Sequence, residues 1–288
     1  MPLPFFTKRG VKTEMSFVDH LEELRWHITR SLLAIIVGAI VVFMNIDWIF
    51  EQIVLGPLRK DFFSYTALCD FGQWLKIGDA LCLPPPFKDT SQGMLQTTAF
   101  GSEFMSSITI SFMSGFILAF PYVFWELWRF IKPALSAKEL KSTRGAIIFV
   151  SFFFFLGVAF GYYLLAPFTF SFLANYSLGT SGLLVTKPTL ADYLENLVDI
   201  IIGAALAFQL PIISSVLTRI GIITPTFLRT YRKYAYVGIL VIAAIITPSP
   251  DWMSQLIVFV PLAILYELSV LISVRIFKAE QKKMKDWE

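Results

Sequence analysis

Residues 147–168 form an uninterrupted apolar run, IIFVSFFFFLGVAFGYYLLAPF, that contains no charged side chain. A helix of about 20 apolar residues is long enough to cross the hydrocarbon core of a bilayer. Of all 288 residues, 56% are hydrophobic and 16% are charged, whereas about 25% of the residues in soluble domains are charged. A chain of this size cannot bury that much apolar surface in one core. The sequence therefore predicts an integral membrane protein and argues against a soluble enzyme or a nucleic-acid-binding protein.

Six segments are apolar enough to be transmembrane helices. They cover residues 29–50, 104–131, 146–173, 194–218, 234–249 and 253–274. The fifth segment is short, and only a few residues separate it from the sixth, so we expect a hairpin of short fifth and sixth helices. The alternating ten-residue strands of a membrane β-barrel are not visible. The predicted fold is an all-α integral membrane protein in which residues 1–288 form a single polytopic domain.

The placement of basic residues indicates the orientation. With six spans and a cytoplasmic N-terminus, 19 of the 24 lysines and arginines fall on the cytoplasmic side. The remaining five fall on the opposite side: Arg59, Lys60, Lys76, Lys88 and Lys187. An excess of basic residues in cytoplasmic segments is the usual determinant of membrane topology. We therefore expect both termini to be cytoplasmic.

The segment before the first span has its own pattern. In residues 14–28, four apolar side chains recur at spacings of four, three and four: Phe17, Leu21, Leu24 and Ile28. This spacing predicts an amphipathic helix on the cytoplasmic membrane surface. Residues 1–27 are polar and of mixed charge, so we expect no cleavable signal peptide at this end.

The connection between the first two spans, residues 51–103, is the longest loop and lies outside the cytoplasm in this topology. It contains both cysteines of the chain, Cys69 and Cys82. Because disulfides form in oxidising compartments, this placement favours a Cys69–Cys82 disulfide. Two reduced, unreactive cysteines are the alternative.

The chain lacks the motifs of common catalytic sites. There is no phosphate-binding loop and no dinucleotide-binding glycine pattern. His20 and His27 are the only histidines, and without neighbouring cysteines they predict surface or interfacial side chains rather than a metal site. We expect no catalytic residue, no metal and no cofactor.

Polar residues within the spans are informative because burying them in lipid is unfavourable. Glu126 lies near the inner end of the second span, where its side chain either extends to the membrane interface or pairs with Arg129. Asp199 lies deep in the fourth span and is expected to face protein or water. Gln209 precedes Pro211, so its amide either satisfies the carbonyl that the proline leaves free or contacts a partner. Gln255 and Glu267 occupy the sixth span.

Several motifs together resemble the TatC family of twin-arginine protein translocases. They are HLEELR at 20–25, LGPL at 55–58, WRFIKPAL at 128–135 with KE at 138–139, FQLP at 208–211 and TPSPD at 247–251 followed by Gln255. Gly157, Phe160, Tyr162, Pro167, Phe172 and Leu173 match the family's third span. Each motif alone is short, but their order and spacing are specific, and the resemblance covers roughly residues 14–275.

The resemblance implies a receptor, embedded in the bacterial inner membrane, for N-terminal signal peptides that carry paired arginines. In the family, carboxylates at the positions of Glu23 and Glu139 bind this signal, while Arg25, Phe130 and Pro57 shape the site. A carboxylate suits the task because it accepts two hydrogen bonds from one guanidinium group. From the residues alone, the favoured interpretation is that Glu23 pairs with His27 one turn later and that Glu139 is a neighbour of Arg144.

The resemblance also implies partners. TatA-type and TatB-type single-span subunits bind the outer half of spans five and six in this family, and the receptor self-associates. The positions concerned are Gln209, Ala244, Ile245, Ile246, Thr247 and Gln255. Many members carry glutamate at the Gln209 position, and the amide retains hydrogen bonding but cannot titrate. The proton-motive force would drive export of folded proteins.

A small secondary transporter is the competing interpretation. Such a protein is expected to contain internal repeats and broken helices around a site at the membrane midplane. The halves 1–140 and 141–288 show no convincing internal symmetry, and charges near the midplane are few. Binding of a twin-arginine peptide distinguishes the two functions.

Overall fold

The structure, a computed structural model, describes residues 17–74, 76, 82–87, 95–131, 145–176, 187–219, 221, 223–246 and 252–285. Within these residues the chain is almost entirely helical, which confirms the predicted fold class. The β-type contact among them is an isolated bridge between Gln96 and Thr189. Thr189 also caps the helix that follows, since its side chain accepts a hydrogen bond from the Asp192 amide.

The long helices correspond to the predicted spans. They are α1 (Phe17–Phe43), α4 (Ser102–Ile131), α6 (Ala146–Phe160), α7 (Ala166–Asn175), α8 (Leu190–Ala207), α9 (Leu210–Arg219), α11 (Arg232–Ile246) and α12 (Trp252–Lys285). The π-helical turn η6 (Gly161–Leu165) joins α6 to α7, and a turn at Phe208–Gln209 joins α8 to α9. Among the residues that the structure describes, five continuous segments are able to cross a membrane by their length and composition, namely Leu21–Phe43, Ser102–Ile131, Ile147–Asn175, Leu190–Thr218 and Gln255–Ala279. Helix α11, with 15 residues, is the short fifth helix.

The helix boundaries differ most from the prediction in two places, and α1 also ends at Phe43, before the predicted end of the first span at residue 50. Residues 17–43 form one helix, so residues 17–28 are the first turns of α1 rather than a separate surface helix. The expectation of a short sixth helix is wrong, because α12 has 34 residues and continues past residue 274. The physical reason is the same in both places. Neither 17–37 nor 275–285 contains the glycine or proline that would end a helix.

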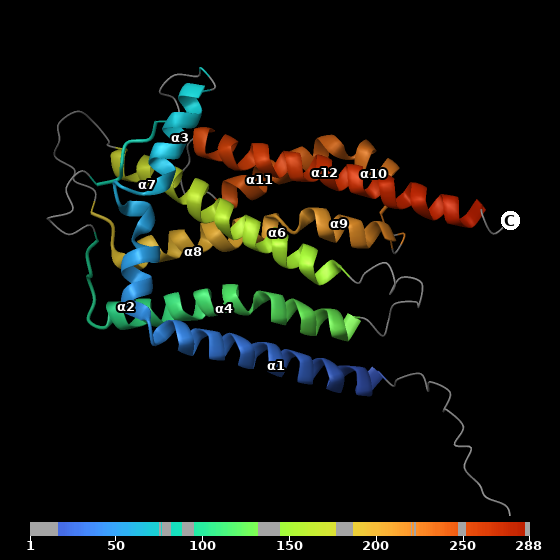
Figure 1. The fold of residues 1–288 in the computed structure, drawn as a ribbon, viewed down its shortest axis with the longest axis horizontal. Coiled ribbons are helices and arrows are strands. Elements are labelled where there is room, and N and C mark those ends of the chain that lie inside the picture. Colours follow the sequence, from blue (N-terminus) through green and yellow to red (C-terminus); the bar gives the residue numbers. More distant parts are fainter. Residues whose placement is uncertain are drawn as a thin grey trace, which may run out of the picture.

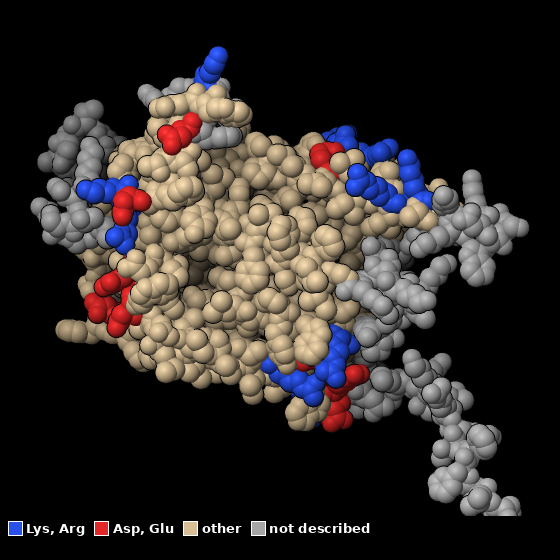
Figure 2. Space-filling view, in the orientation of Figure 1, with Lys and Arg blue, Asp and Glu red and all other residues tan. Residues whose placement is uncertain are grey.

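The helices form a bundle in which α1 occupies one edge (Figure 1). Helix α1 packs on α4, α4 packs on α6 and α8, and α12 packs on α9 and α11. Helix α1 begins and α12 ends at the same end of the bundle, which we call the terminal end. The opposite, loop end carries α2 (Ile46–Ile49) and α3 (Phe63–Trp74). Charged side chains gather toward these two ends and leave an apolar belt between them on the face shown in Figure 2, as expected for a protein that spans a bilayer.

Small residues allow the helix axes to approach closely. A Cβ atom built on Gly115 of α4 would lie 2.5 Å from the Ala39 nitrogen of α1. On Gly157 of α6 it would lie 2.7 Å from the Ala205 Cα of α8. Association of membrane helices depends on this kind of backbone approach because lipid provides no hydrophobic driving force.

At the loop end, three tyrosines hold the connection that follows α2. This connection contains the π-helical turn η1 (Phe50–Val54) and the 3₁₀ turn η2 (Gly56–Leu58). Tyr162 donates to the Ile53 carbonyl at 2.7 Å, Tyr65 donates to the Pro57 carbonyl at 2.6 Å, and Tyr193 donates to the Val54 carbonyl. Burial raises the pKa of Tyr65 well above its ordinary range. The hydroxyls thus satisfy carbonyls that irregular turns would otherwise leave unpaired.

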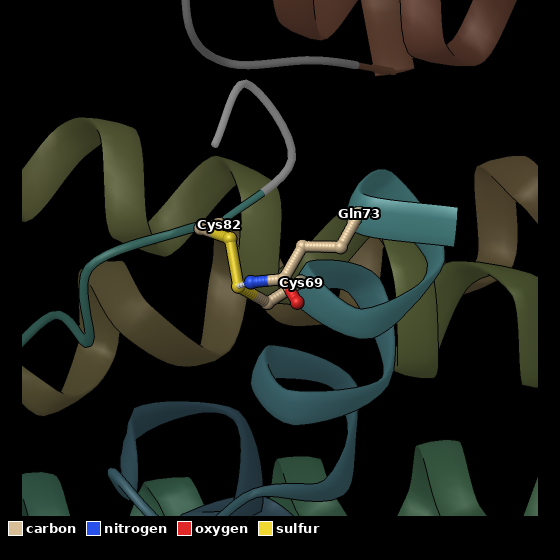
Figure 3. Close-up of a disulfide and its surroundings, with 3 residues drawn as sticks. All are labelled: Cys69, Gln73 and Cys82. Atoms are coloured by element: carbon tan, nitrogen blue, oxygen red, sulfur yellow. Dashed lines mark hydrogen bonds between the residues drawn. A yellow bond between two sulfur atoms is a disulfide. The ribbon is translucent and has the colours of Figure 1, made fainter. Parts of the chain in front are cut away.

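The two cysteines are joined in a disulfide (Figure 3). Cys69 lies on α3, and Cys82 lies in the segment 82–87 that runs back toward the bundle. In the same segment, the Pro84 carbonyl accepts a hydrogen bond from Ser171 of α7. The pairing favoured by the sequence is therefore the one present in the structure, and it ties α3 to a segment that is anchored on α7.

Candidate functional site

A buried pair of ionisable side chains joins α1 to α4 near the terminal end. His27 Nδ1 lies 2.5 Å from Glu126 Oε2, and the exposed fractions of the two side chains are 7% and 1%. On the other side of the ring, His27 Nε2 lies 3.9 Å from Glu23 Oε1. The Glu23 side chain is 37% exposed. The imidazole ring therefore lies between a buried carboxylate and a carboxylate that reaches the surface.

Two aromatic residues of α4 complete this cluster. Tyr122 donates its hydroxyl proton to Glu126 Oε1 at 3.1 Å, so both carboxylate oxygens of Glu126 are occupied. The Phe130 ring meets the His27 ring edge-on, with the centroids 6.1 Å apart. We call Glu23, His27, Tyr122, Glu126 and Phe130 the α1–α4 cluster. It offers a partly exposed carboxylate whose surroundings are fixed by packing and hydrogen bonds.

Of the five residues that the resemblance assigns to the signal peptide, the structure brings Glu23 and Phe130 together around His27. Arg25 points elsewhere: its guanidinium group lies 3.4 Å from Glu22, and both side chains are largely exposed. Pro57 is buried in η2 at the loop end, so most of the length of α1 separates it from Glu23. The position of Pro57 fits a structural role in the turn and not a shared contact surface. Glu139 lies outside the described residues.

The cluster corrects two expectations from the sequence. His27 is buried and paired, not a surface or interfacial histidine. Glu126 of α4 pairs with His27 of α1 and accepts a hydrogen bond from Tyr122 of its own helix. The Arg129 side chain packs over the Trp125 ring instead. The sequence did contain one indication of a pairing at Glu126, because an acidic residue in an apolar span requires a partner. Sequence spacing pointed to the neighbour on the same helix because the facing helix was not known.

The residues assigned to partner binding do not form one surface. Gln209 is buried and donates to the Val150 carbonyl of α6 at 3.4 Å, so its amide is used inside the bundle rather than on the carbonyl freed by Pro211. Ala244 and Ile245 are exposed on α11, and Ile245 is 77% exposed. Ile246 is buried, in contact with Gly203 of α8.

The start of α12 provides a further polar contact near this face. Gln255 donates to the Leu240 carbonyl of α11 at 3.2 Å and so links the two helices of the predicted hairpin. Thr247 lies outside the described residues. The exposed C-terminal part of α11, with Ala244 and Ile245, is thus the portion of the predicted partner site that is open to another helix.

The other acidic residues within the spans have distinct environments. Glu267 of α12 accepts a hydrogen bond from Arg232 at 2.9 Å and one from Tyr236 at 2.6 Å, which neutralises its charge between α11 and α12. Asp199 of α8 is exposed on the surface of the bundle. In the described part of the chain, no group of three or more His, Cys, Asp or Glu side chains is arranged to hold a metal ion.

Comparison with known proteins supplies the family. The model of the family described as Sec-independent protein translocase protein (TatC) matches residues 19–261. The chain is 37% identical over 271 residues to the Sec-independent protein translocase protein TatC of Blattabacterium sp. subsp. Periplaneta americana, which covers 94% of this chain and 99% of that relative. It is 34% identical over 260 residues to TatC of Deinococcus radiodurans, which covers 90% of this chain and 86% of that relative.

A solved structure agrees with this assignment. The fold is similar to a crystal structure of the twin arginine translocase receptor TatC, with 30% sequence identity and a TM-score of 0.66. The match covers 90% of this chain and 99% of that one. The order of the helices, the sequence relatives and the solved neighbour agree. The chain belongs to the TatC family of Sec-independent protein translocase proteins.

Proposed function

We propose that this chain is the receptor subunit of a twin-arginine translocase and binds the paired arginines of a signal peptide at Glu23. The observation that carries the proposal is the partly exposed Glu23 carboxylate, which His27 separates from the buried Glu126 carboxylate. The α1–α4 cluster thus places two carboxyl groups around one histidine. A guanidinium group binds strongly to such an acceptor through charge-assisted hydrogen bonds. Glu139 is the second carboxylate of the proposed site.

The proposal includes an orientation. The terminal end, where α1 begins and α12 ends, faces the cytoplasm of a bacterial cell, and the loop end faces away from it across the inner membrane. The 19-to-5 distribution of basic residues supports this orientation. A disulfide at the loop end is consistent with it, because disulfides persist in oxidising compartments. The proton-motive force is the proposed energy source.

Replacing Glu23 by glutamine tests the site. The substitution keeps the size of the side chain but removes the charge, so we expect the affinity for an Arg-Arg signal peptide to fall roughly 10–100-fold, the value of a charge-assisted hydrogen bond. The measurement is fluorescence anisotropy of a labelled peptide on the full-length protein in nanodiscs. Glu22→Gln is the matched control, since Glu22 is exposed and pairs with Arg25, and we expect its affinity to remain within about twofold of wild type.

A Lys-Lys version of the peptide completes this experiment, because an ammonium group cannot form the planar, two-pronged contact of guanidinium. We expect weak binding of Lys-Lys to the wild-type protein. If both peptides bind equally, or if neither binds, the receptor proposal fails and the transporter interpretation returns.

We further propose that single-span TatA-type and TatB-type subunits bind the exposed outer part of α11. Ile245 is 77% exposed there, and an apolar side chain on a lipid-facing helix is a ready contact for another helix. A photo-crosslinking residue at position 245 is expected to label such a partner several-fold more than one at Val237, which is 63% exposed on the same helix. Equal labelling from both positions would place the partner elsewhere or along the whole helix.

A further inference from the structure

His27 faces a carboxylate with each of its ring nitrogens. Nδ1 lies 2.5 Å from Glu126 Oε2, and Nε2 lies 3.9 Å from Glu23 Oε1. An imidazole ring with a hydrogen on both nitrogens carries a positive charge, whereas the neutral ring donates from one nitrogen only. The contact with Glu126 is short and buried, and the contact with Glu23 is longer and reaches the surface. The two nitrogens are therefore not equivalent, because Nδ1 faces a buried carboxylate and Nε2 faces a carboxylate that is 37% exposed.

The charged groups around the ring come from two helices. Helix α1 contributes Glu23 directly, with Glu22 and Arg25 paired to each other on its exposed side. Helix α4 contributes Glu126 and Tyr122, while Arg129 packs over Trp125. Arg30 of α1 attracts the Glu126 carboxylate electrostatically. Histidine is the side-chain type whose change of charge ordinarily falls between pH 5 and 8, and His27 is the histidine in this cluster.

We propose that the His27 imidazolium competes with the signal peptide's guanidinium for Glu23, so that peptide binding releases a proton from the receptor. The proposal rests on the proposed function, because it assigns regulation to the same site. The imidazolium and the incoming guanidinium are both cations and both require the Glu23 carboxylate. With a cation 3.9 Å from that carboxylate, a second cation binds there less favourably.

The proton balance follows from the geometry. When guanidinium binds Glu23, the proton on Nε2 passes to solvent, and the Nδ1 hydrogen remains in its bond to Glu126. The ring stays in place as the neutral tautomer, and Tyr122 continues to hold the other Glu126 oxygen. One positive charge enters the cluster and one leaves. The buried Glu126 is thus a positioning residue that acts through His27 and does not touch the peptide.

The test is the affinity of an Arg-Arg peptide as a function of pH, measured on the full-length protein in nanodiscs. The peptide has blocked termini and contains no histidine, aspartate or glutamate, so it does not titrate in this range. We expect the affinity to rise several-fold from pH 5.5 to pH 8, because binding that releases a proton becomes more favourable as the pH rises. A flat profile for the wild-type protein would overturn the inference.

Variants of the cluster separate proton linkage from a structural role. In His27→Gln, we expect measurable binding whose pH dependence is lost. In His27→Lys, we expect low affinity throughout, because the cation is permanent. In Glu126→Gln, which retains hydrogen-bonding atoms but removes the buried charge, we expect weaker binding at pH 8 by several-fold. His20→Gln is the matched control, since it removes the other histidine, and its profile is expected to follow wild type.

The outcomes also separate this inference from the proposed function. If the wild-type protein prefers Arg-Arg over Lys-Lys but its affinity does not change with pH, the receptor function stands and the proton linkage fails. If His27→Gln retains the wild-type slope, another group is responsible and the inference fails in the same way. If the wild-type protein binds neither peptide at any pH, the proposed function itself fails.

Discussion

Gly115→Val is expected to destabilise the protein by about 3 kcal/mol, the upper part of the range for overpacked sites. A Cβ at position 115 would lie 2.5 Å from the Ala39 nitrogen and 2.8 Å from the Ala39 Cα, so it would meet backbone atoms that cannot rotate away. The two helices must separate to admit the side chain. Among the described helices, α1 packs principally on α4, so little else compensates. The measurement is the thermal unfolding midpoint of the detergent-solubilised protein.

The same substitution at Gly238 is the matched control for this prediction. Gly238 lies on α11, and a Cβ there would meet no atom within 4 Å. We expect Gly238→Val to change the free energy of unfolding by less than about 1 kcal/mol, the scale of helix propensity alone. Because α1 and α4 also carry the α1–α4 cluster, Gly115→Val is expected to weaken Arg-Arg peptide binding as well. An unchanged midpoint for Gly115→Val would contradict the close crossing of α1 and α4.

Removing the disulfide is expected to have the second large effect, and the effect is local. Cys69 and Cys82 are separated by 13 positions, and closing a loop of this size stabilises the folded segment by roughly 3 kcal/mol in the chain-entropy model. We therefore expect amide hydrogen exchange in α3 to accelerate about 100-fold in Cys69→Ser/Cys82→Ser. Exchange in the middle of α12 is expected to be unaffected, since α12 packs on α9 and α11.

Reductant provides the control for this experiment. It is expected to accelerate exchange in α3 of the wild-type protein and to have no effect on the double serine variant. If α3 exchanges at the same rate in all three samples, the packing of α3 on the bundle, and not the disulfide, determines its stability.

The membrane spans were predictable because a bilayer requires helices of a certain length and low polarity, and both properties can be read from the sequence. The uncharged run at 147–168 could be recognised as a span without knowledge of its tertiary contacts. The structure places this run in α6, η6 and α7. The π-helical turn within that run was not predictable, because its backbone differs from an α-helix without any change in hydrophobicity. Tyr162, the second residue of that turn, donates to the Ile53 carbonyl 109 positions away.

The α1–α4 cluster shows why only part of the site followed from the sequence. Glu126 was recognisable as a buried acid in need of a partner, but His27 is 99 positions away and Arg129 is three. Spacing rules describe neighbours on one helix. The contact between α1 and α4 depends instead on Gly38 and Gly115, which allow the two backbones to approach closely where the helices cross. The pair of Glu23 with His27 was predictable, because both lie on α1 at i and i+4.

Helix α11 has a consequence for the lipid around the protein. Its 15 residues rise about 22 Å, whereas the hydrocarbon core of a typical bilayer is about 30 Å thick. The bilayer beside α11 must become locally thinner to match this helix, which costs a fraction of a kcal/mol per Å of mismatch. The last residue of α11, Ile246, contacts Gly203, and the exposed Asp199 lies one turn from Gly203 on α8. Where the bilayer thins to match α11, we expect headgroups and water to lie closer to Asp199 than they would beside a helix of full length. The thickness of the surrounding membrane is then expected to affect this side of the protein.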